Sequence, residues 1–508
     1  MTDATLARPL REEVMRLLNA GQHDAASARL DAARRDDPKS PEPSTIFGEV
    51  LVGVGRSVEA LPVFEQALAL DPAYPHALYG RGRARQGTGD LDGAKADFAK
   101  TLERAPDHVG ALAQLADLAA RAGDSVVARD YAARAHAGDP HEPVSNLALV
   151  SADLVDGQFF DAEQRARRLL ASGRLSAHNA AIVLGQLGDA LDGQIRQDEA
   201  FDAYTQSNEG LRTVYAKAFA RPEEHSPLGH ARRLIRYFEN TPEALWTAAS
   251  EGSPGPARMH VFLVGFPRSG TTLLEQVLAS HPDVTALEEK TCLEDAVRAF
   301  FIDDAGLERL KVATDAELEP LRAAYWKRVA EHGVEPQGRV FVDKMPLNTV
   351  LLPLIVRLFP DARVLFAVRD PRDVALSCFR RRFGMNPAMY QMLTLKGAAE
   401  YYDAVLTLAT LYHDRLPLDV HEVRYERLVE SFEAEARAAA AFIGIDWIEG
   451  MADFADTARA RAVNTPSSQQ VARGLYQEGA GQWRAYADKL APVMPILGPW
   501  VDRLGYAP

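Results

Sequence analysis

The chain is poor in cysteine, in long hydrophobic runs and in excess positive charge, and each shortage excludes a class of protein. Its two cysteines, Cys292 and Cys378, are too few for a disulfide framework or a cysteine-based zinc cluster, so we expect two buried thiols. No run of about 18 apolar residues occurs, so no membrane span is expected. The formal net charge of −14 argues against nucleic-acid binding as the main function.

The N-terminal segment also lacks an apolar core of the length found in secretory signal peptides. Together with the scarcity of cysteine, this favours a cytoplasmic location. The remaining composition, 47% hydrophobic and 25% charged, is that of a soluble globular protein. A chain of 508 residues is long enough for more than one domain.

The N-terminal part repeats itself every 34 residues. Prolines fall at positions 38, 72, 106 and 140, and alanines at 26, 60, 94, 128 and 162. Gly48 and Gly82 precede two of these alanines, and Phe64 and Phe98 follow the same two. The pattern resembles the tetratricopeptide repeat, in which each unit is a pair of helices. Small residues let the two helices approach closely, and the proline ends the second helix. A sixth unit, with a slip of four residues, would include Gly188 and Tyr204.

We therefore predict an α-superhelix of tetratricopeptide-like helix pairs over residues 1–215. A helical linker is expected over 216–256, because this segment ends in a stretch rich in proline and glycine. The array could offer a concave surface to a partner or to an acceptor substrate, such as a protein or a glycan. It could equally be a spacer or an oligomerisation arm, because the repeat itself encodes no chemistry.

From residue 257 to 508 apolar strands alternate with helices. Strands are expected at 261–264, 340–342, 364–368 and 420–424, and helices at 321–331, 398–415 and 433–443. This alternation predicts an α/β domain with a parallel sheet covered on both faces. Ligands of such domains bind at the carboxyl ends of the strands.

The most informative segment follows the first of these strands. Gly265 and Gly270 bound a short loop, and the apolar run after Thr271 predicts a helix. A glycine loop between a strand and a helix cradles phosphate with backbone N–H groups and the helix N-terminus. The glycine spacing is that of a Walker A loop, but Thr271 stands where that motif has lysine. The ligand is therefore expected to be a nucleotide other than ATP or GTP.

Two further strand ends carry cationic residues. Arg369 follows the third predicted strand, and Ser377 comes eight residues later on the next helix. An arginine and a hydroxyl there could hold a second phosphate by charge-assisted hydrogen bonds. Lys344 ends the second predicted strand and is expected to face the same crevice.

The segments 265–273 and 369–377 resemble the two nucleotide motifs of sulfotransferases that use 3′-phosphoadenosine-5′-phosphosulfate (PAPS). Within that superfamily the chain is most similar to tyrosylprotein sulfotransferases and to bacterial enzymes that join tetratricopeptide repeats to a sulfotransferase domain, a P-loop-like α/β fold. The resemblance implies that Arg369 and Ser377 bind the 3′-phosphate. The residues implied to bind the 5′-phosphosulfate are Arg268, Ser269, Gly270, Thr271 and Thr272.

The resemblance also implies catalytic roles. Glu289, after the His281-Pro282 turn, matches the general base of the tyrosylprotein branch, and Lys344 matches its catalytic lysine. Arg268 and Lys344 would stabilise the leaving oxygen. Tyr425 would contact the nucleotide or frame the site. Arg473, together with the segment 481–484, resembles the late loop that closes over the nucleotide.

This chain departs from the tyrosylprotein branch directly after the base. Lys290 and Thr291 stand where that branch has threonine and arginine, so its acceptor contacts cannot be assumed. The scheme requires no metal, and the sequence has no histidine, cysteine and carboxylate cluster that suggests one. Two other hypotheses remain: a tetratricopeptide scaffold with a non-catalytic nucleotide-binding domain, and a nucleotide kinase.

Overall fold

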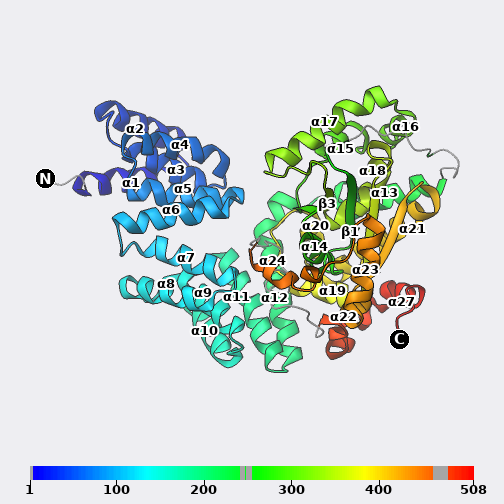
Figure 1. Cartoon of the computed structure of the whole chain (residues 1–508). Helices are drawn as coiled ribbons and strands as arrows, with labels where there is room; N and C mark the ends of the chain where they lie inside the picture. The colour runs from blue at the N-terminus through cyan, green and yellow to red at the C-terminus, as the bar shows by residue number, and fades with distance from the viewer. Residues whose placement is uncertain (1–3, 241–245, 247–254, 461–478, 508) are drawn as a thin grey trace. The chain divides into compact units, whose positions relative to one another are not determined.

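The structure, a computed structural model, describes residues 4–240, 246, 255–460 and 479–507. The chain forms two compact units (Figure 1). Unit 1 comprises Met1–Ser176 and Asp189–Ile195, and unit 2 comprises Ala177–Gly188 and Arg196–Pro508. The division therefore falls inside one helix, α11 (Ala177–Gly193), and not at the expected boundary after residue 215.

Unit 1 is built from consecutive antiparallel helix pairs, which confirms the predicted tetratricopeptide-like architecture (Figure 1). Four of its helices end two residues before the repeated prolines, as expected of a residue that cannot continue a helix. Its helices are α1 (Ala4–Asn19), α2 (His23–Asp36), α3 (Glu42–Gly53), α4 (Ser57–Leu70), α5 (Pro75–Thr88), α6 (Leu91–Arg104), α7 (Val109–Arg121), α8 (Ser125–Gly138), α9 (Pro143–Val155) and α10 (Phe159–Ala171).

The repeated glycines and aromatics touch one another inside the helix pairs. A Cβ atom on Gly48 would lie 2.6 Å from the ring of Phe64, and one on Gly82 would lie 2.6 Å from the ring of Phe98. Only glycine leaves room for each ring, so the spacing in the sequence records a packing requirement. In the pair formed by α11 and α12 (Gln197–Phe219), Gly188 and Tyr204 make the same contact at 2.5 Å, as predicted for a sixth unit.

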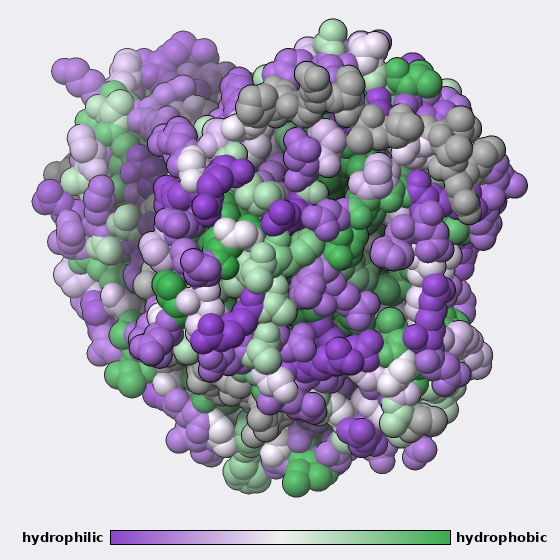
Figure 2. Space-filling view, turned by 45° about the vertical axis from the view of Figure 1, so that its right-hand side comes forward, coloured by the Kyte–Doolittle hydropathy of each residue, from purple (hydrophilic) through white to green (hydrophobic). Residues whose placement is uncertain are grey.

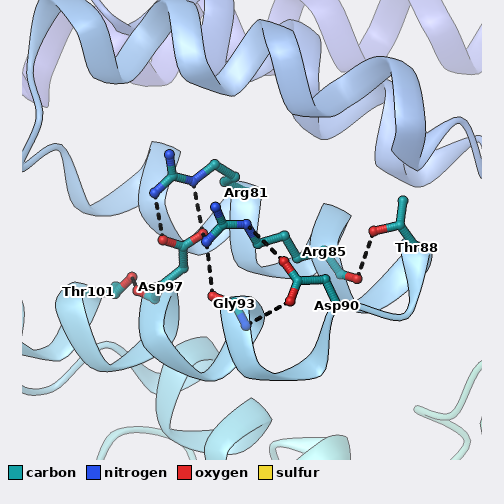
Figure 3. Close-up of polar contacts among 7 residues, drawn as sticks. All are labelled: Arg81, Arg85, Thr88, Asp90, Gly93, Asp97 and Thr101. Carbon is teal, nitrogen blue, oxygen red and sulfur yellow. Dashed lines mark hydrogen bonds and ion pairs between the residues drawn. The ribbon is translucent and has the colours of Figure 1, made fainter. Parts of the chain in front are cut away.

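A buried ionic network joins α5 to α6 (Figure 3). The carboxylate of Asp97, only 1% exposed, accepts two hydrogen bonds from Arg81, at 2.9 and 2.7 Å, and one from Arg85 at 2.9 Å. Arg85 also donates to the carbonyl of Gly93, whose N–H is capped by Asp90. A buried carboxylate is tolerated when arginines neutralise it in this way.

Unit 2 contains a parallel sheet of five strands in the order β2-β3-β1-β4-β5. Its strands are β1 (Met259–Gly265), β2 (Val284–Glu288), β3 (Val340–Lys344), β4 (Arg363–Val368) and β5 (Asp419–Arg424). The four predicted strands are confirmed. The fifth, β2 at one edge of the sheet, was not predicted from the sequence.

Alternate residues of the strands enter two hydrophobic cores, one on each face of the sheet. Val261 and Leu263 of β1 pack on one face, and Phe262 and Val264 pack on the other. This arrangement confirms the predicted parallel sheet covered on both faces. The helices after β1 include α14 (Thr271–Ala279), α15 (Glu294–Phe300), α16 (Asp304–Val312), α17 (Asp315–Glu331), α18 (Leu352–Leu358), α19 (Pro371–Arg380), α20 (Pro387–Gln391), α21 (Leu395–Arg415), α22 (Tyr425–Glu430), α23 (Phe432–Ile443), α24 (Phe454–Ala460), α26 (Ala487–Leu490) and α27 (Met494–Arg503).

The segment expected to be a helical linker contains a helix of the unit 2 core. In α13 (Pro227–Asn240), Leu228, Leu234 and Phe238 are buried in the same core as β1 and α21. Helix α13 is therefore part of unit 2 because of its tertiary packing. The sequence shows only an amphipathic helix beside a proline-rich break, and this does not indicate where the helix packs. Most of the expected proline- and glycine-rich stretch lies outside the described residues.

The structure also shows the environment of the two cysteines and the character of the helices and of one surface. Cys292 and Cys378 are both buried free thiols, as expected. Within the described ranges, no helix is long and apolar enough to cross a membrane. On the face drawn in Figure 2, hydrophilic side chains predominate, and hydrophobic ones gather in a recessed area among them.

Candidate active site

The predicted strand, glycine loop and helix are present as β1, residues 266–270 and α14. Gly265 has φ +150°, and a Cβ atom there would lie 2.5 Å from the carbonyl oxygen of Ala367. Gly270, at the N-cap of α14, has φ +96°, and a Cβ atom would lie 2.7 Å from the ring of Tyr425. Both glycines are therefore required by backbone conformation and by close packing.

Thr349, which the sequence analysis did not single out, holds the junction of strand and loop. This fully buried residue lies in the 3-10 helix η3 (Pro346–Leu351). Its hydroxyl accepts a hydrogen bond from the N–H of Gly265 at 2.9 Å and lies 2.8 Å from the carbonyl oxygen of the same residue. The hydroxyl also lies 2.9 Å from the carbonyl oxygen of Pro346, so Thr349 connects η3 to the point where the loop begins.

Arg268 is held inside the loop in a conformation that non-glycine residues rarely adopt, with φ +72°. Its Nε donates to the hydroxyl of Ser377 at 2.9 Å, so the two predicted nucleotide motifs meet through these side chains. Burial, followed by the charges of Arg381 and Arg369, lowers the pKa of Arg268 to about 9. The positive charges of three guanidinium groups thus repel one another at the loop, and an anionic ligand bound there would reduce this repulsion.

Arg369 lies at the end of β4 in a cage of backbone and aromatic groups. It donates to the carbonyl oxygen of Arg268 at 2.9 Å and also to that of Gly479, and its guanidinium carbon lies 4.7 Å from the centre of the Tyr425 ring. Its buried Nε has no hydrogen-bond partner among the described residues. A buried donor without a partner is costly, so these residues fit an anion such as the 3′-phosphate of a nucleotide.

Two consecutive arginines at the end of α19 have different roles. Arg380 stacks over the rings of Tyr204 and Tyr486, each 5.3 Å from the guanidinium carbon. Arg381 is close enough to Arg268 to lower the pKa of that residue, so its positive charge belongs to the rim of the site.

Glu289 and Lys344 meet at the carboxyl ends of β2 and β3. Lys344 Nζ donates to the carboxylate of Glu289 at 2.8 Å, and the N–H of Glu289 donates to the carbonyl of Lys344, also at 2.8 Å. Glu289 has φ +49°, and the described non-glycine residues with positive φ are this residue, Arg268 and Ile195. Strained backbone of this kind clusters at functional sites because the surroundings must enforce it.

Glu275 and Glu288 complete this charge cluster, and neither had been predicted as a site residue. Lys344, which is fully buried, lies 3.5 Å from Glu275 and 3.3 Å from Glu288. Burial lowers the pKa of Lys344, but the charges of Glu275, Glu289 and Glu288 outweigh it and raise the pKa above its ordinary value. Lys344 is therefore held in its charged form. A glutamate about one turn into the helix after the glycine loop gives no recognisable signal in the sequence.

A pocket lies between the loop and the base. It includes five of the predicted residues but does not reach Arg369, Ser377 or Tyr425. The residues that line it are Pro267, Arg268, Gly270, Thr271, Thr272, Glu289, Met345, Pro346, Leu347, Phe383 and Met389.

The remaining predicted residues lie as follows. Ser269 is buried in the loop, and its N–H donates to the carbonyl of Phe266 at 3.2 Å. His281 accepts from the N–H of Asp283, as expected of a structural turn residue. The N–H of Trp483, in the late segment, donates to Asp373 at 2.8 Å. Arg473 lies outside the described residues. Among the residues described, no group of histidine, cysteine, aspartate and glutamate is arranged to hold a metal ion.

This arrangement can bind an anionic nucleotide and can hold a carboxylate beside it. Residues 260–449 match the model of the sulfotransferase family, and residues 11–75 and 51–115 match models of the tetratricopeptide repeat.

Relatives resemble different parts of the chain. An uncharacterized protein of Aquifex aeolicus is 26% identical over 404 residues, which cover 78% of this chain and 51% of that protein. A putative protein-tyrosine sulfotransferase of Caenorhabditis briggsae is 26% identical over 259 residues, covering 48% of this chain and 88% of that protein. The solved sulfotransferase domain from the curacin biosynthetic pathway is 18% identical with a TM-score of 0.36, covering 51% of this chain and 99% of that domain.

This chain thus spans about half the length of the Aquifex protein. It joins a segment that matches the tetratricopeptide repeat to a segment that matches the sulfotransferase family.

Proposed function

We propose that unit 2 is a PAPS-dependent sulfotransferase that moves a sulfuryl group to an acceptor hydroxyl. The observation that carries this proposal is the meeting of Arg268, Arg369 and Ser377, through hydrogen bonds of 2.9 Å, at a glycine loop whose helix begins with Thr271 instead of the Walker lysine. The buried Nε of Arg369, which lacks a partner among the described residues, supports a second phosphate there.

Each end of the nucleotide has its own set of residues in this proposal. Arg268 and the segment 269–272 hold the 5′-phosphosulfate through side chains, loop amides and the N-terminus of α14. Arg369 and Ser377 hold the 3′-phosphate. Tyr425, which packs against Gly270 and beneath Arg369, frames the site from below.

The donor supplies a sulfuryl group, which passes to the acceptor oxygen as its bond to the bridging phosphate oxygen breaks. Glu289 accepts the proton of the acceptor hydroxyl, a role worth ~10²–10⁴-fold in rate for a positioned base. Arg268 and Lys344 stabilise the negative charge that develops on the bridging oxygen. Such a reaction depends mainly on positioning and charge stabilisation.

The repeats of unit 1 are proposed to bind an acceptor or a separate protein partner. The cytoplasmic location stays a prediction. The loop without the Walker lysine disfavours a kinase, and the combination of Glu289 with Lys344 disfavours a scaffold with a non-catalytic domain.

Calorimetric titration with adenosine 3′,5′-bisphosphate and with ATP tests the donor site. We expect the wild-type protein to bind the bisphosphate at micromolar concentration and to bind ATP weakly. Arg268→Ala should abolish bisphosphate binding, whereas Arg339→Ala, a change at an exposed arginine of the same unit, should not. Binding of ATP alone would indicate a kinase instead.

The base is tested separately. Glu289→Ala should abolish sulfuryl transfer but leave bisphosphate binding intact. Unchanged turnover in this variant would remove Glu289 from the mechanism without affecting the assignment of the donor site.

A further inference from the structure

The pocket beside Glu289 has two chemically different halves. One half consists of Arg268, Glu289 and the loop from Gly270 to Thr272. The other half is entirely apolar and is formed by Met345, Pro346, Leu347, Phe383 and Met389, together with Pro267. A site with one polar end and one apolar end selects ligands that are divided in the same way.

Two separate segments build the apolar half. Met345 lies between β3 and η3, and Leu347 lies on η3, which Thr349 ties to the loop. Phe383 precedes α20, and Met389 lies on it. Leu347, Phe383 and Met389 are half-buried against the core of unit 2, so they have a fixed backing and keep a free side toward the pocket.

The pocket that contains the apolar half includes the base and does not include the residues proposed for the 3′-phosphate. Glu289 lines the pocket, whereas Arg369, Ser377 and Tyr425 do not. A group that enters this pocket next to the base is therefore the acceptor rather than the nucleotide. The adenine ring is the alternative occupant, and the experiment below separates the two.

The chemistry of the wall disfavours a sugar acceptor. Each sugar hydroxyl that left water for this wall would lose hydrogen bonds with no polar side chain on that half to replace them. A hydrocarbon group would instead gain about 0.8 kcal/mol for each CH₂ removed from water. The methionines add adaptability, because an unbranched thioether side chain can adjust to groups of different shape.

We propose that this half of the pocket is the acceptor subsite and that it takes a hydroxyl carried on a hydrocarbon body, either an alkyl chain or an aromatic ring. The inference rests on the proposed sulfotransferase function and names its acceptor class. The apolar body packs against Leu347, Phe383 and Met389, and its hydroxyl then points to Glu289.

The test is calorimetric titration of the full chain, first saturated with adenosine 3′,5′-bisphosphate. The probes are 1-octanol, 2-naphthol and methyl β-glucoside. We expect at least one of the two apolar alcohols to bind about tenfold or more tightly than the glucoside. Which of them binds more tightly distinguishes an alkyl from an aromatic acceptor.

Leu347→Ser and Met389→Ser should each weaken the apolar alcohol about five- to tenfold and leave bisphosphate affinity unchanged. Val312→Ser, at a valine that is 72% exposed and outside the pocket, is the matched control and should change neither affinity.

Three results would overturn the inference. The glucoside could bind as tightly as both alcohols, or none of the three could bind detectably. The two serine variants could weaken the bisphosphate instead, which would assign the wall to the nucleotide. If the wild-type protein failed to bind bisphosphate at all, the proposed function itself would fail, and that outcome is visible in the first titration.

Discussion

Lys344 is surrounded by carboxylates of three different origins: Glu275 from α14, Glu288 at the end of β2 and Glu289 after it. Glu289 is proposed to act as the base, and Glu288 is partly exposed, which leaves buried Glu275 as the fixed anchor. Since α14 also opens at the phosphate loop, Glu275 couples the position of Lys344 to that of the loop. Glu275 is therefore a positioning residue.

Glu275→Gln should lower kcat about tenfold and leave bisphosphate affinity within about twofold, because only the placement of Lys344 is lost. Glu275 is the largest of the effects that raise the pKa of Lys344, so the pKa should fall in this variant. The loss of activity at alkaline pH should then begin at lower pH than in the wild type. Glu294→Gln, at an exposed position nearby, is the control. A uniform loss of activity with an unchanged pH profile would indicate a merely structural role.

Asp343, the neighbour of Lys344 on β3, has a different environment. It is buried, accepts a hydrogen bond from Tyr325 at 2.6 Å, and has its pKa raised by burial to about 7. In the folded protein this carboxyl therefore holds its proton to higher pH than in the unfolded chain. Its contribution to stability is complete below the unfolded pKa near 4 and is lost as pH rises toward 7.

The free energy of unfolding of unit 2 should therefore fall between pH 4 and 7, by up to about 1.4 kcal/mol per pH unit from this group. Asp343→Asn should flatten that dependence, because the amide oxygen can still accept from Tyr325 but does not titrate. Urea unfolding followed by tryptophan fluorescence measures unit 2 alone, since all five tryptophans lie in it. An identical pH dependence in the variant would show that Asp343 does not titrate as expected.

At the scale of the element, the sequence predicted helices and strands that have a periodic or apolar pattern of their own. It did not predict elements that are defined by packing against a distant segment. The apolar runs of β1, β3 and β4 were predicted, and so was the edge strand β5, but β2 at the other edge, with the sequence VTALE, has no such run. Its pairing with β3 sets Glu288 opposite Lys344. Motif spacing therefore identified Glu289, but it did not identify β2, the strand that places Glu289 beside Lys344.

The packing of α13 in the core of unit 2 went unpredicted for a similar reason. The apolar face of α13 contacts α21, which lies far along the chain, and a helix whose partner is distant resembles a linker helix in the sequence. The glycine and aromatic positions of the repeats were predictable because both partners lie within one period. The roles of Thr349 and Glu275 were not, since each acts on a residue from another element.

The network around Asp97 allows a prediction for one helix pair of unit 1 (Figure 3). Asp97→Asn would leave Arg81 and Arg85 without their shared counter-charge in a largely buried place. We expect a loss of about 1–3 kcal/mol in local stability, and amide hydrogen exchange in α5 and α6 about tenfold faster or more. Asp92→Asn, at an exposed position of α6, should have no effect. Unchanged exchange in α5 and α6 of the Asp97 variant would contradict this expectation.

At the scale of the whole molecule, α12, the second helix of the last pair in the repeat pattern, belongs to unit 2. Asn208 of α12 donates to the carbonyl of Phe379 at 2.9 Å, and the ring of Phe201 lies 5.1 Å from that of Phe379. Tyr390 on α20 donates to the carbonyl of Arg212 at 3.3 Å. Helix α12 thus supports the end of α19, near Ser377 and Arg381, and the helix that carries Met389 of the pocket wall.

The smallest part of the chain that folds as unit 2 should therefore begin well before the segment that matches the sulfotransferase family. A chain of residues 177–508 keeps α12 and α13 and should fold, show one cooperative thermal transition and bind adenosine 3′,5′-bisphosphate like the full chain. A chain of residues 257–508 contains the whole matched segment, 260–449, but lacks Phe201, Asn208 and the buried face of α13.

We expect the shorter chain to be insoluble or to melt at least about 10 °C lower, because several large side chains lose their buried partners. A chain of residues 220–508 contains α13 but lacks α12. A partial recovery of its melting temperature would separate the contribution of α13 to stability from that of α12. Equal stability and equal bisphosphate affinity of the 257–508 and 177–508 chains would contradict the argument. It would mean that residues 257–508 fold stably without α12. It would also mean that replacing the repeats does not weaken nucleotide binding at the donor site.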